Sequence, residues 1–146
     1  MLAQAIKRRL SKEENQKGFT LIELLAVIVI LGIIAVIAIP MIGKIITNAK
    51  EDSDLATARQ VYDAARLYVI GEENGDYTAG AVDVSKIISE GYLDKIYLPS
   101  TKEVISTGSV NFDSSGQLTD TAATTNDAVI LNSSKFSAES VLKAEK

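Results

Sequence analysis

Residues 17–43 read KGFTLIELLAVIVILGIIAVIAIPMIG, and the rest of the chain is organised around this stretch. From Leu24 to Gly43 it contains 20 residues without a charge. A helix rises about 1.5 Å per residue, so this length matches the roughly 30 Å hydrocarbon core of a bilayer. The stretch therefore predicts a helix that spans a membrane.

The uncharged run differs from an ordinary cleavable signal peptide. It is longer than the roughly 7–15 residues of a signal peptide's apolar region, and no clean cleavage site of small residues follows it. In addition, Glu23 lies at its upstream edge. A charge near hydrocarbon costs about 2.5–3.5 kcal/mol on insertion scales, so Glu23 is expected to have a binding partner.

Charge predicts the orientation of the span. Residues 1–18 carry five basic and two acidic side chains, whereas the remainder of the chain has a net charge of −7. Positive residues beside a membrane span stay in the cytoplasm, so we expect a cytoplasmic leader at residues 1–18 and an acidic head outside. An acidic head also argues against direct nucleic acid binding.

The string GFTLIELL at residues 18–25 resembles the class III signal of type IV prepilins and pseudopilins. The resemblance rests on Gly18, the adjoining Phe19, Glu23 four residues later and the long apolar run. It implies that a prepilin peptidase cuts between Gly18 and Phe19 and methylates the new amine of Phe19. It also implies that the subunit polymerises with copies of itself, served by an assembly ATPase and a platform membrane protein.

Two pairings are open for Glu23. The Phe19 amine of the same chain lies one helical turn away, within reach of an i,i+4 contact. The Phe19 amine of a neighbouring subunit would instead neutralise two charges inside an apolar filament core. The resemblance implies the second pairing, and the residues alone do not choose.

Within the predicted span, Gly32 and Pro40 are the weak points of the helix. Pro40 has no backbone N–H and its ring crowds the carbonyl of Val36, so we expect a kink or a segment that unwinds on assembly. The alternative is an ordinary membrane helix, because such helices tolerate glycine and proline.

The fold class predicted for the whole chain is α+β, with a long helix packed against a small antiparallel sheet. We expect a span at 19–43, an amphipathic helix at 44–71 that ends near Gly71, and a head at 72–146. An apolar stripe at helical spacing marks the amphipathic part: Leu55, Ala58, Tyr62, Ala65 and Val69.

Short elements are predicted within the head from turn residues and β-branched runs. A helix is expected in 83–93 and strands at 103–106, 110–112, 117–119 and 128–131, with a hairpin turn that needs a positive φ at Gly116. Residues 132–146 predict a polar tail, either frayed or with a short helix capped by Ser137.

The chain contains no cysteine and no histidine. This composition excludes disulfides, thiol nucleophiles, Cys/His zinc sites and catalytic triads, so the head is expected to hold together by packing alone. Many Gram-negative pilins have a carboxy-terminal disulfide, so its absence favours the Gram-positive members. No paired carboxylates or glycine-rich phosphate loop are evident, and we predict neither enzymatic activity nor a cofactor.

Asp113, Ser115 and Asp120 supply oxygen atoms of the kind that bind Ca²⁺. Their spacing does not match an EF-hand loop, and the alternative interpretation is a hairpin turn with an acidic rim. We therefore predict no metal site and retain these residues as weak candidates.

The predicted function is that of a pilin, held in the cell membrane before assembly and found in a filament at the cell surface afterwards. The alternatives are a competence pseudopilin, a type II secretion pseudopilin, and a membrane-tethered surface binding domain that never polymerises. The residues do not separate a major from a minor subunit, or a role in adhesion from one in motility or DNA uptake.

Overall fold

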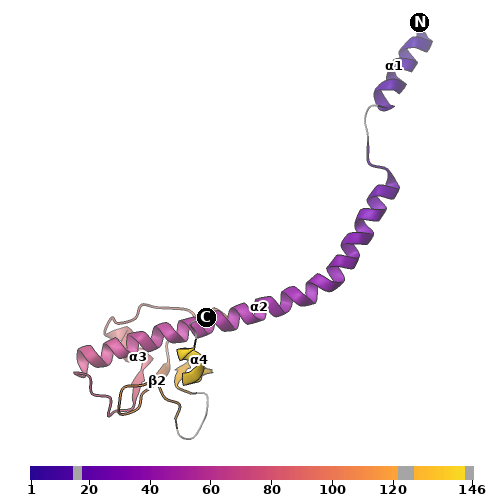
Figure 1. Cartoon of the computed structure of the whole chain (residues 1–146). Coiled ribbons are helices and arrows are strands. Elements are labelled where there is room, and N and C mark those ends of the chain that lie inside the picture. The colour runs from indigo at the N-terminus through magenta and orange to yellow at the C-terminus, as the bar shows by residue number, and fades with distance from the viewer. Residues whose placement is uncertain (15–17, 122–126, 144–146) are drawn as a thin grey trace. The chain divides into compact units, whose positions relative to one another are not determined.

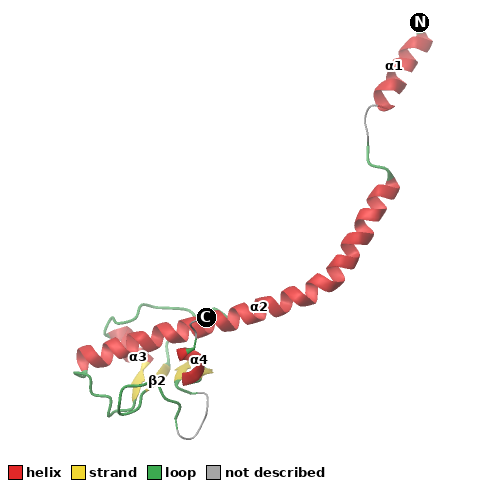
Figure 2. Ribbon diagram, viewed as in Figure 1, coloured by secondary structure: helices red, strands yellow, loops and turns green. Residues whose placement is uncertain are grey.

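A computed structural model describes residues 1–14, 18–121 and 127–143 of the chain. It divides into two compact units, Met1–Lys44 and Ile45–Lys146. The elements, shown in Figure 1 and by type in Figure 2, are α1 (Leu2–Glu14), α2 (Leu21–Glu72), β1 (Ala81–Asp83), α3 (Val84–Ser89), β2 (Gly108–Asn111), β3 (Val129–Leu131), β4 (Ser134–Phe136) and α4 (Ala138–Leu142). Within the predicted leader, residues 15–17 lie outside the described part.

Helix α2 is 52 residues long and remains helical through Gly32 and Pro40. The apolar stripe predicted for its second half is confirmed, because Ala58, Tyr62, Ala65 and Val69 are buried and Leu55 is half-buried. The buried face is wider than the stripe, since it also takes in Val61, Ala64 and Tyr68. The second half of α2 is therefore the central element of the head's core.

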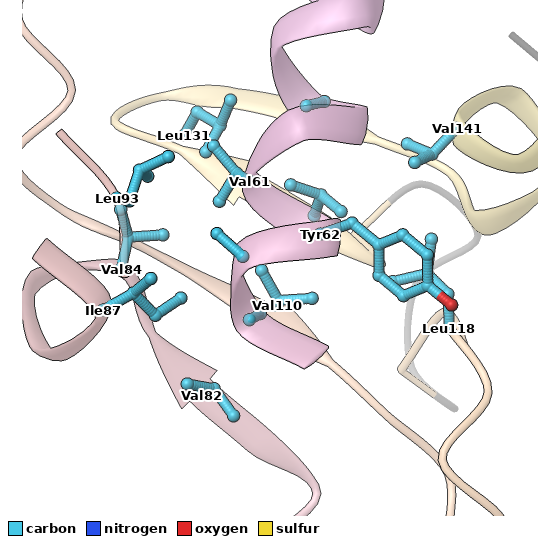
Figure 3. Packing of buried hydrophobic residues seen from close by; sticks show 14 of the residues in the cluster. Val61, Tyr62, Val82, Val84, Ile87, Leu93, Val110, Leu118, Leu131 and Val141 are labelled. Carbon is cyan, nitrogen blue, oxygen red and sulfur yellow. The ribbon is translucent and has the colours of Figure 1, made fainter. Parts of the chain in front are cut away.

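The sheet has four antiparallel strands in the order β1-β2-β3-β4, which confirms the predicted α+β class. Its central register pairs Val82 with Val110, and Val110 with Val129. In Figure 3, Val61 and Tyr62 of α2 lie among apolar side chains from the strands and loops, namely Val82, Val110, Leu118 and Leu131.

The predicted hairpin and the predicted strand at 103–106 are both present in a shorter form than expected. Residues 110–112 and 117–119 meet at a single bridge, Phe112–Leu118, while the ladder partners of β2 are β1 and β3. The predicted strand at 103–106 likewise makes one bridge, between Val104 and Tyr97. Both edges of β2 are occupied, with Val82 and Val129 buried beside Val110, and the local turn adds Phe112 and Leu118 to the same core.

Two further predictions from the sequence concern glycines. Gly116 has a φ of +81°, as predicted for the turn. Helix α2 ends at Glu72, one residue beyond Gly71 and close to the predicted end, and it is followed by Asn74 and Gly75 with positive φ. At Gly71 the helix is approached by Tyr92, whose hydroxyl would lie 2.2 Å from an added Cβ.

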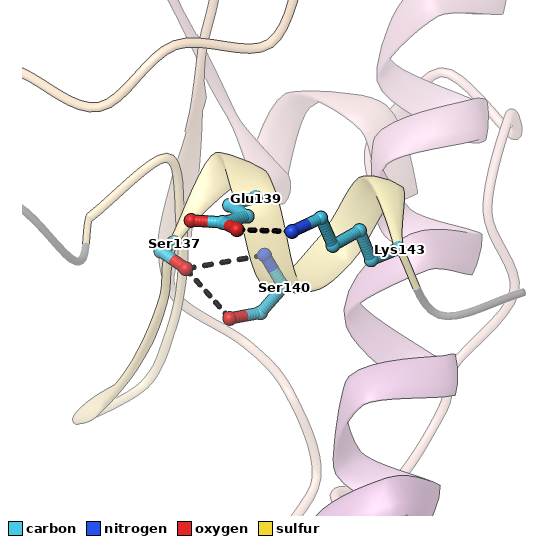
Figure 4. Close-up of polar contacts among 4 residues, drawn as sticks. All are labelled: Ser137, Glu139, Ser140 and Lys143. Atoms are coloured by element: carbon cyan, nitrogen blue, oxygen red, sulfur yellow. Dashed lines mark hydrogen bonds and ion pairs between the residues drawn. The ribbon is translucent and has the colours of Figure 1, made fainter.

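The carboxy-terminal segment is more ordered than predicted, because it contributes both β4 and α4. Ser137 caps α4 as expected, since its Oγ accepts from the Ser140 N–H at 3.2 Å. Figure 4 shows this cap and the ion pair between Glu139 and Lys143.

Polar contacts hold both ends of α4, so the head does not rely on packing alone. Asp120 Oδ1 accepts from the Ala138 N–H at 3.2 Å, and also from the backbone N–H groups of Asp127 and Ala128. At the other end, Arg59 Nη1 donates to the carbonyls of Val141 and Leu142 at 3.1 and 3.2 Å. A carboxylate before a helix and a cation after it both interact favourably with the helix dipole.

Gly108→Ala is expected to destabilise the head by at least about 3 kcal/mol. Gly108 has a φ of +147°, and an added Cβ would lie 2.0 Å from the Ile130 carbonyl oxygen. Gly75→Ala is the matched control, because its φ is +79° but nothing lies within 4 Å, and it should cost about 1 kcal/mol. Thermal unfolding of the full chain in detergent measures both, and equal losses would contradict the close approach.

Asp120→Ala is expected to lower the free energy of unfolding by about 1–3 kcal/mol, because three backbone N–H groups lose a charged acceptor. Asp120→Asn keeps an acceptor oxygen and should lose less. The same unfolding measurement distinguishes them, and an alanine variant as stable as the asparagine variant would show that the carboxylate does not hold α4.

Candidate functional site at the start of helix α2

The predicted cleavage point lies immediately before α2. Residues 18–20 are not helical, and the helix begins at Leu21. The carbonyl of Thr20 accepts the first intrahelical hydrogen bond, from the Leu24 N–H at 3.1 Å, which makes Thr20 the N-cap residue. The Gly18–Phe19 peptide bond is therefore outside the helix, and Phe19 is 83% exposed.

Thr20 and Glu23 bind each other in both directions. The Thr20 N–H donates to Glu23 Oε2 at 2.8 Å, and the Glu23 N–H donates to Thr20 Oγ1 at 3.3 Å. This reciprocal pair is a capping box, which satisfies two backbone donors that the first turn of a helix leaves free. The carboxylate also lies at the positive end of the helix dipole.

The binding partner that Glu23 requires is thus supplied by its own chain. Sequence reasoning considered only the Phe19 amine and missed Thr20, although a threonine three residues before a glutamate is the signature of a capping box. Gly18, Phe19, Thr20 and Glu23 together line one open hollow of about 320 Å³. The three predicted residues are therefore brought together, with Thr20 as the fourth.

The apolar run that follows is uncovered by the chain itself. Among the described residues, α2 is the one helix long and apolar enough to cross a membrane. Its most apolar window has a mean hydropathy of 3.2 and no buried residue. A Cβ added at Gly32 would meet nothing within 4 Å, so no contact within the chain explains this glycine. Unwinding between Gly32 and Pro40 stays a prediction.

The weak calcium candidates are engaged in hydrogen bonds. Asp113 Oδ1 accepts from the Ser115 N–H, the Ser115 hydroxyl and the Gln117 N–H, within one turn. Asp120 is instead bound to the backbone at the start of α4. No group of three or more Asp, Glu, His or Cys side chains that could hold a metal ion gathers in the described ranges.

Acidification is expected to loosen the turn at Asp113. The Ser115 hydroxyl, followed by the Gln117 N–H, lowers the pKa of the Asp113 carboxyl. Stability from this carboxylate is therefore present above its unfolded pKa of about 3.9 and is lost as pH falls through the lower folded value. Amide exchange at Ser115 and Gln117 should accelerate at low pH, beyond the intrinsic pH effect, and Asp113→Ala should abolish that excess. An excess that persists in this variant would assign the titration to another group.

Comparison with known proteins adds two findings. Residues 15–39 match the family described as the prokaryotic N-terminal methylation motif. The chain is also similar to a fimbrial protein of Neisseria meningitidis serogroup B, with 35% identity over 83 residues, which are 56% of this chain and 49% of the relative. The chain thus spans about half the length of the curated relative that it matches. No solved structure matches it significantly.

The methylation motif covers the start of α2, where the predicted cleavage point, the capping box and the exposed apolar helix lie. The Gram-positive assignment stays a prediction. The chain therefore contains the prokaryotic N-terminal methylation motif at the start of α2 and is similar to a fimbrial protein over about half of its length.

Proposed function

We propose that the chain is a structural subunit that polymerises through the first half of α2 into a type IV pilus-like filament, after cleavage between Gly18 and Phe19. The observation that carries this proposal is an apolar helix with no buried residue in its most apolar window, followed by a separate compact head with its own core. Such a helix has to be covered by lipid and then, after extraction, by other copies of itself.

Burial of apolar surface stabilises a filament core by about 25 cal/mol per Å² removed from water. A helix that leaves lipid gains much less, because the lipid already covers its apolar side chains. Assembly therefore needs work from outside the subunit, which is the role we assign to an assembly ATPase and a platform membrane protein. The subunit itself acts as a structural component and not as an enzyme.

Cleavage changes the charge at the start of α2. The new amine of Phe19 lies four residues before Glu23, whose carboxylate is held by Thr20 in the described chain. We propose that on assembly the carboxylate meets the amine of a neighbouring subunit, so that neither charge is left alone in an apolar core. Before assembly the leader lies in the cytoplasm and the head outside the membrane, and afterwards the subunit is at the cell surface.

Glu23→Ala is expected to abolish filaments while membrane insertion and cleavage at Gly18–Phe19 continue, because the amine of the next subunit then has no carboxylate. Electron microscopy of sheared cell-surface material measures filaments, and mass spectrometry of the membrane fraction measures cleavage. Glu90→Ala, which removes an exposed carboxylate from the head, is the control and should assemble normally.

The same experiment separates the competing functions. Normal filament yield from Glu23→Ala would refute the charge pairing. Cleaved wild-type subunits without any filaments would favour a tethered binding domain. Short, sparse filaments would favour a competence or secretion pseudopilin over a pilin.

A further inference from the structure

We propose that the Thr20 hydroxyl positions the precursor for cleavage, because by capping α2 it keeps the Gly18–Phe19 peptide bond outside the helix. Thr20 is then a positioning residue for processing, distinct from the part that Glu23 plays in assembly. This inference rests on the proposed function, since it concerns the cleavage that the proposed function requires.

The geometry defines where the helix starts. Thr20 Oγ1 accepts from the Glu23 N–H at 3.3 Å, and the Thr20 carbonyl accepts from the Leu24 N–H at 3.1 Å. In a helix extended upstream, the Glu23 N–H would instead bond to the Phe19 carbonyl, which belongs to the peptide group that directly follows the bond to be cut. The Thr20 hydroxyl occupies that donor and so competes directly with upstream extension.

A peptidase needs an accessible and irregular segment of backbone, because helical peptide groups are hydrogen-bonded and surrounded by side chains. Gly18 and Phe19 meet this condition, since both are exposed and both line the open hollow before α2. Once a helix exists, each added residue gains one hydrogen bond, so the long α2 favours extension. The cap at Thr20 opposes this upstream extension, one residue after the Gly18–Phe19 bond.

The two halves of the capping box have separable roles. Thr20 Oγ1 accepts from the backbone N–H of Glu23, and any residue except proline at position 23 retains this N–H. The other bond uses the Glu23 carboxylate itself. Glu23→Ala therefore keeps the Thr20 cap and remains cleavable. Removal of the Thr20 hydroxyl leaves the carboxylate in place but removes the acceptor that prevents upstream extension of α2.

The test measures the cleavage rate of the full-length precursor in membranes that contain a prepilin peptidase. Thr20→Val keeps the shape of threonine but has no acceptor, whereas Thr20→Ser and Thr20→Asn retain one. An N-cap is worth about 1 kcal/mol, which corresponds to roughly a five-fold change in the ratio of irregular to helical backbone at Gly18–Phe19, and so sets the upper limit of the change in cleavage rate. We expect the valine variant to be cut up to about five-fold more slowly, and the serine and asparagine variants at the wild-type rate.

A second measurement separates positioning from direct recognition of the side chain. Carbon chemical shifts of Gly18 and Phe19 in the detergent-solubilised precursor should move toward helical values in Thr20→Val and stay unchanged in Thr20→Asn. Wild-type cleavage of the valine variant, equally slow cleavage of the asparagine variant, or unchanged shifts in the valine variant would each overturn the inference. A wild-type chain that is not cut at all would refute the proposed function itself.

Discussion

The structure depends on an apolar helix that the chain does not bury. From Leu24 to Gly43 there are 20 residues without a charge, and the most apolar window of α2 has no buried residue. Each Å² of this apolar surface that is removed from water stabilises the protein by about 25 cal/mol. A bilayer and a bundle of identical helices are two environments that would cover it.

The head has to fold without help from that segment. It does so by using the second half of α2 as the centre of its core, with Val61 and Ala65 fully buried against the sheet and loops. Polar contacts complete it: buried Asp54 accepts from the Ser100 N–H at 2.9 Å, and Asp120 and Arg59 hold the two ends of α4. In a chain without cysteine, these carboxylate and guanidinium contacts connect segments that are far apart in sequence.

The first turn of α2 has to serve two incompatible requirements. The proposed cleavage at Gly18–Phe19 needs an exposed and irregular backbone, whereas the proposed span needs a continuous helix from the next few residues onward. The reciprocal hydrogen bonds between Thr20 and Glu23 set the boundary between the irregular segment and the helix. The capping box also gives Glu23 a partner within its own chain. This partner is in addition to the two candidates from the sequence, which are the Phe19 amine of the same chain and that of a neighbouring subunit.

The sequence by itself determined the features that depend on neighbouring residues. Twenty uncharged residues predict a span, the spacing of Ala58, Tyr62, Ala65 and Val69 predicts the buried face of α2, and Ser137 predicts a cap, because helical periodicity and capping act within a few residues. The T-x-x-E pattern from Thr20 to Glu23 is equally local, and it predicts the capping box from the sequence alone.

Only the tertiary structure decided the partners of β2, the place of Tyr92 beside Gly71, and the contacts of Asp120 and Arg59 with α4. Asp120 and Ala138 are 18 residues apart, and Arg59 and Val141 are 82 apart. Such pairs meet because burial of the whole core selects one arrangement of the chain, and no local pattern in the sequence carries that information.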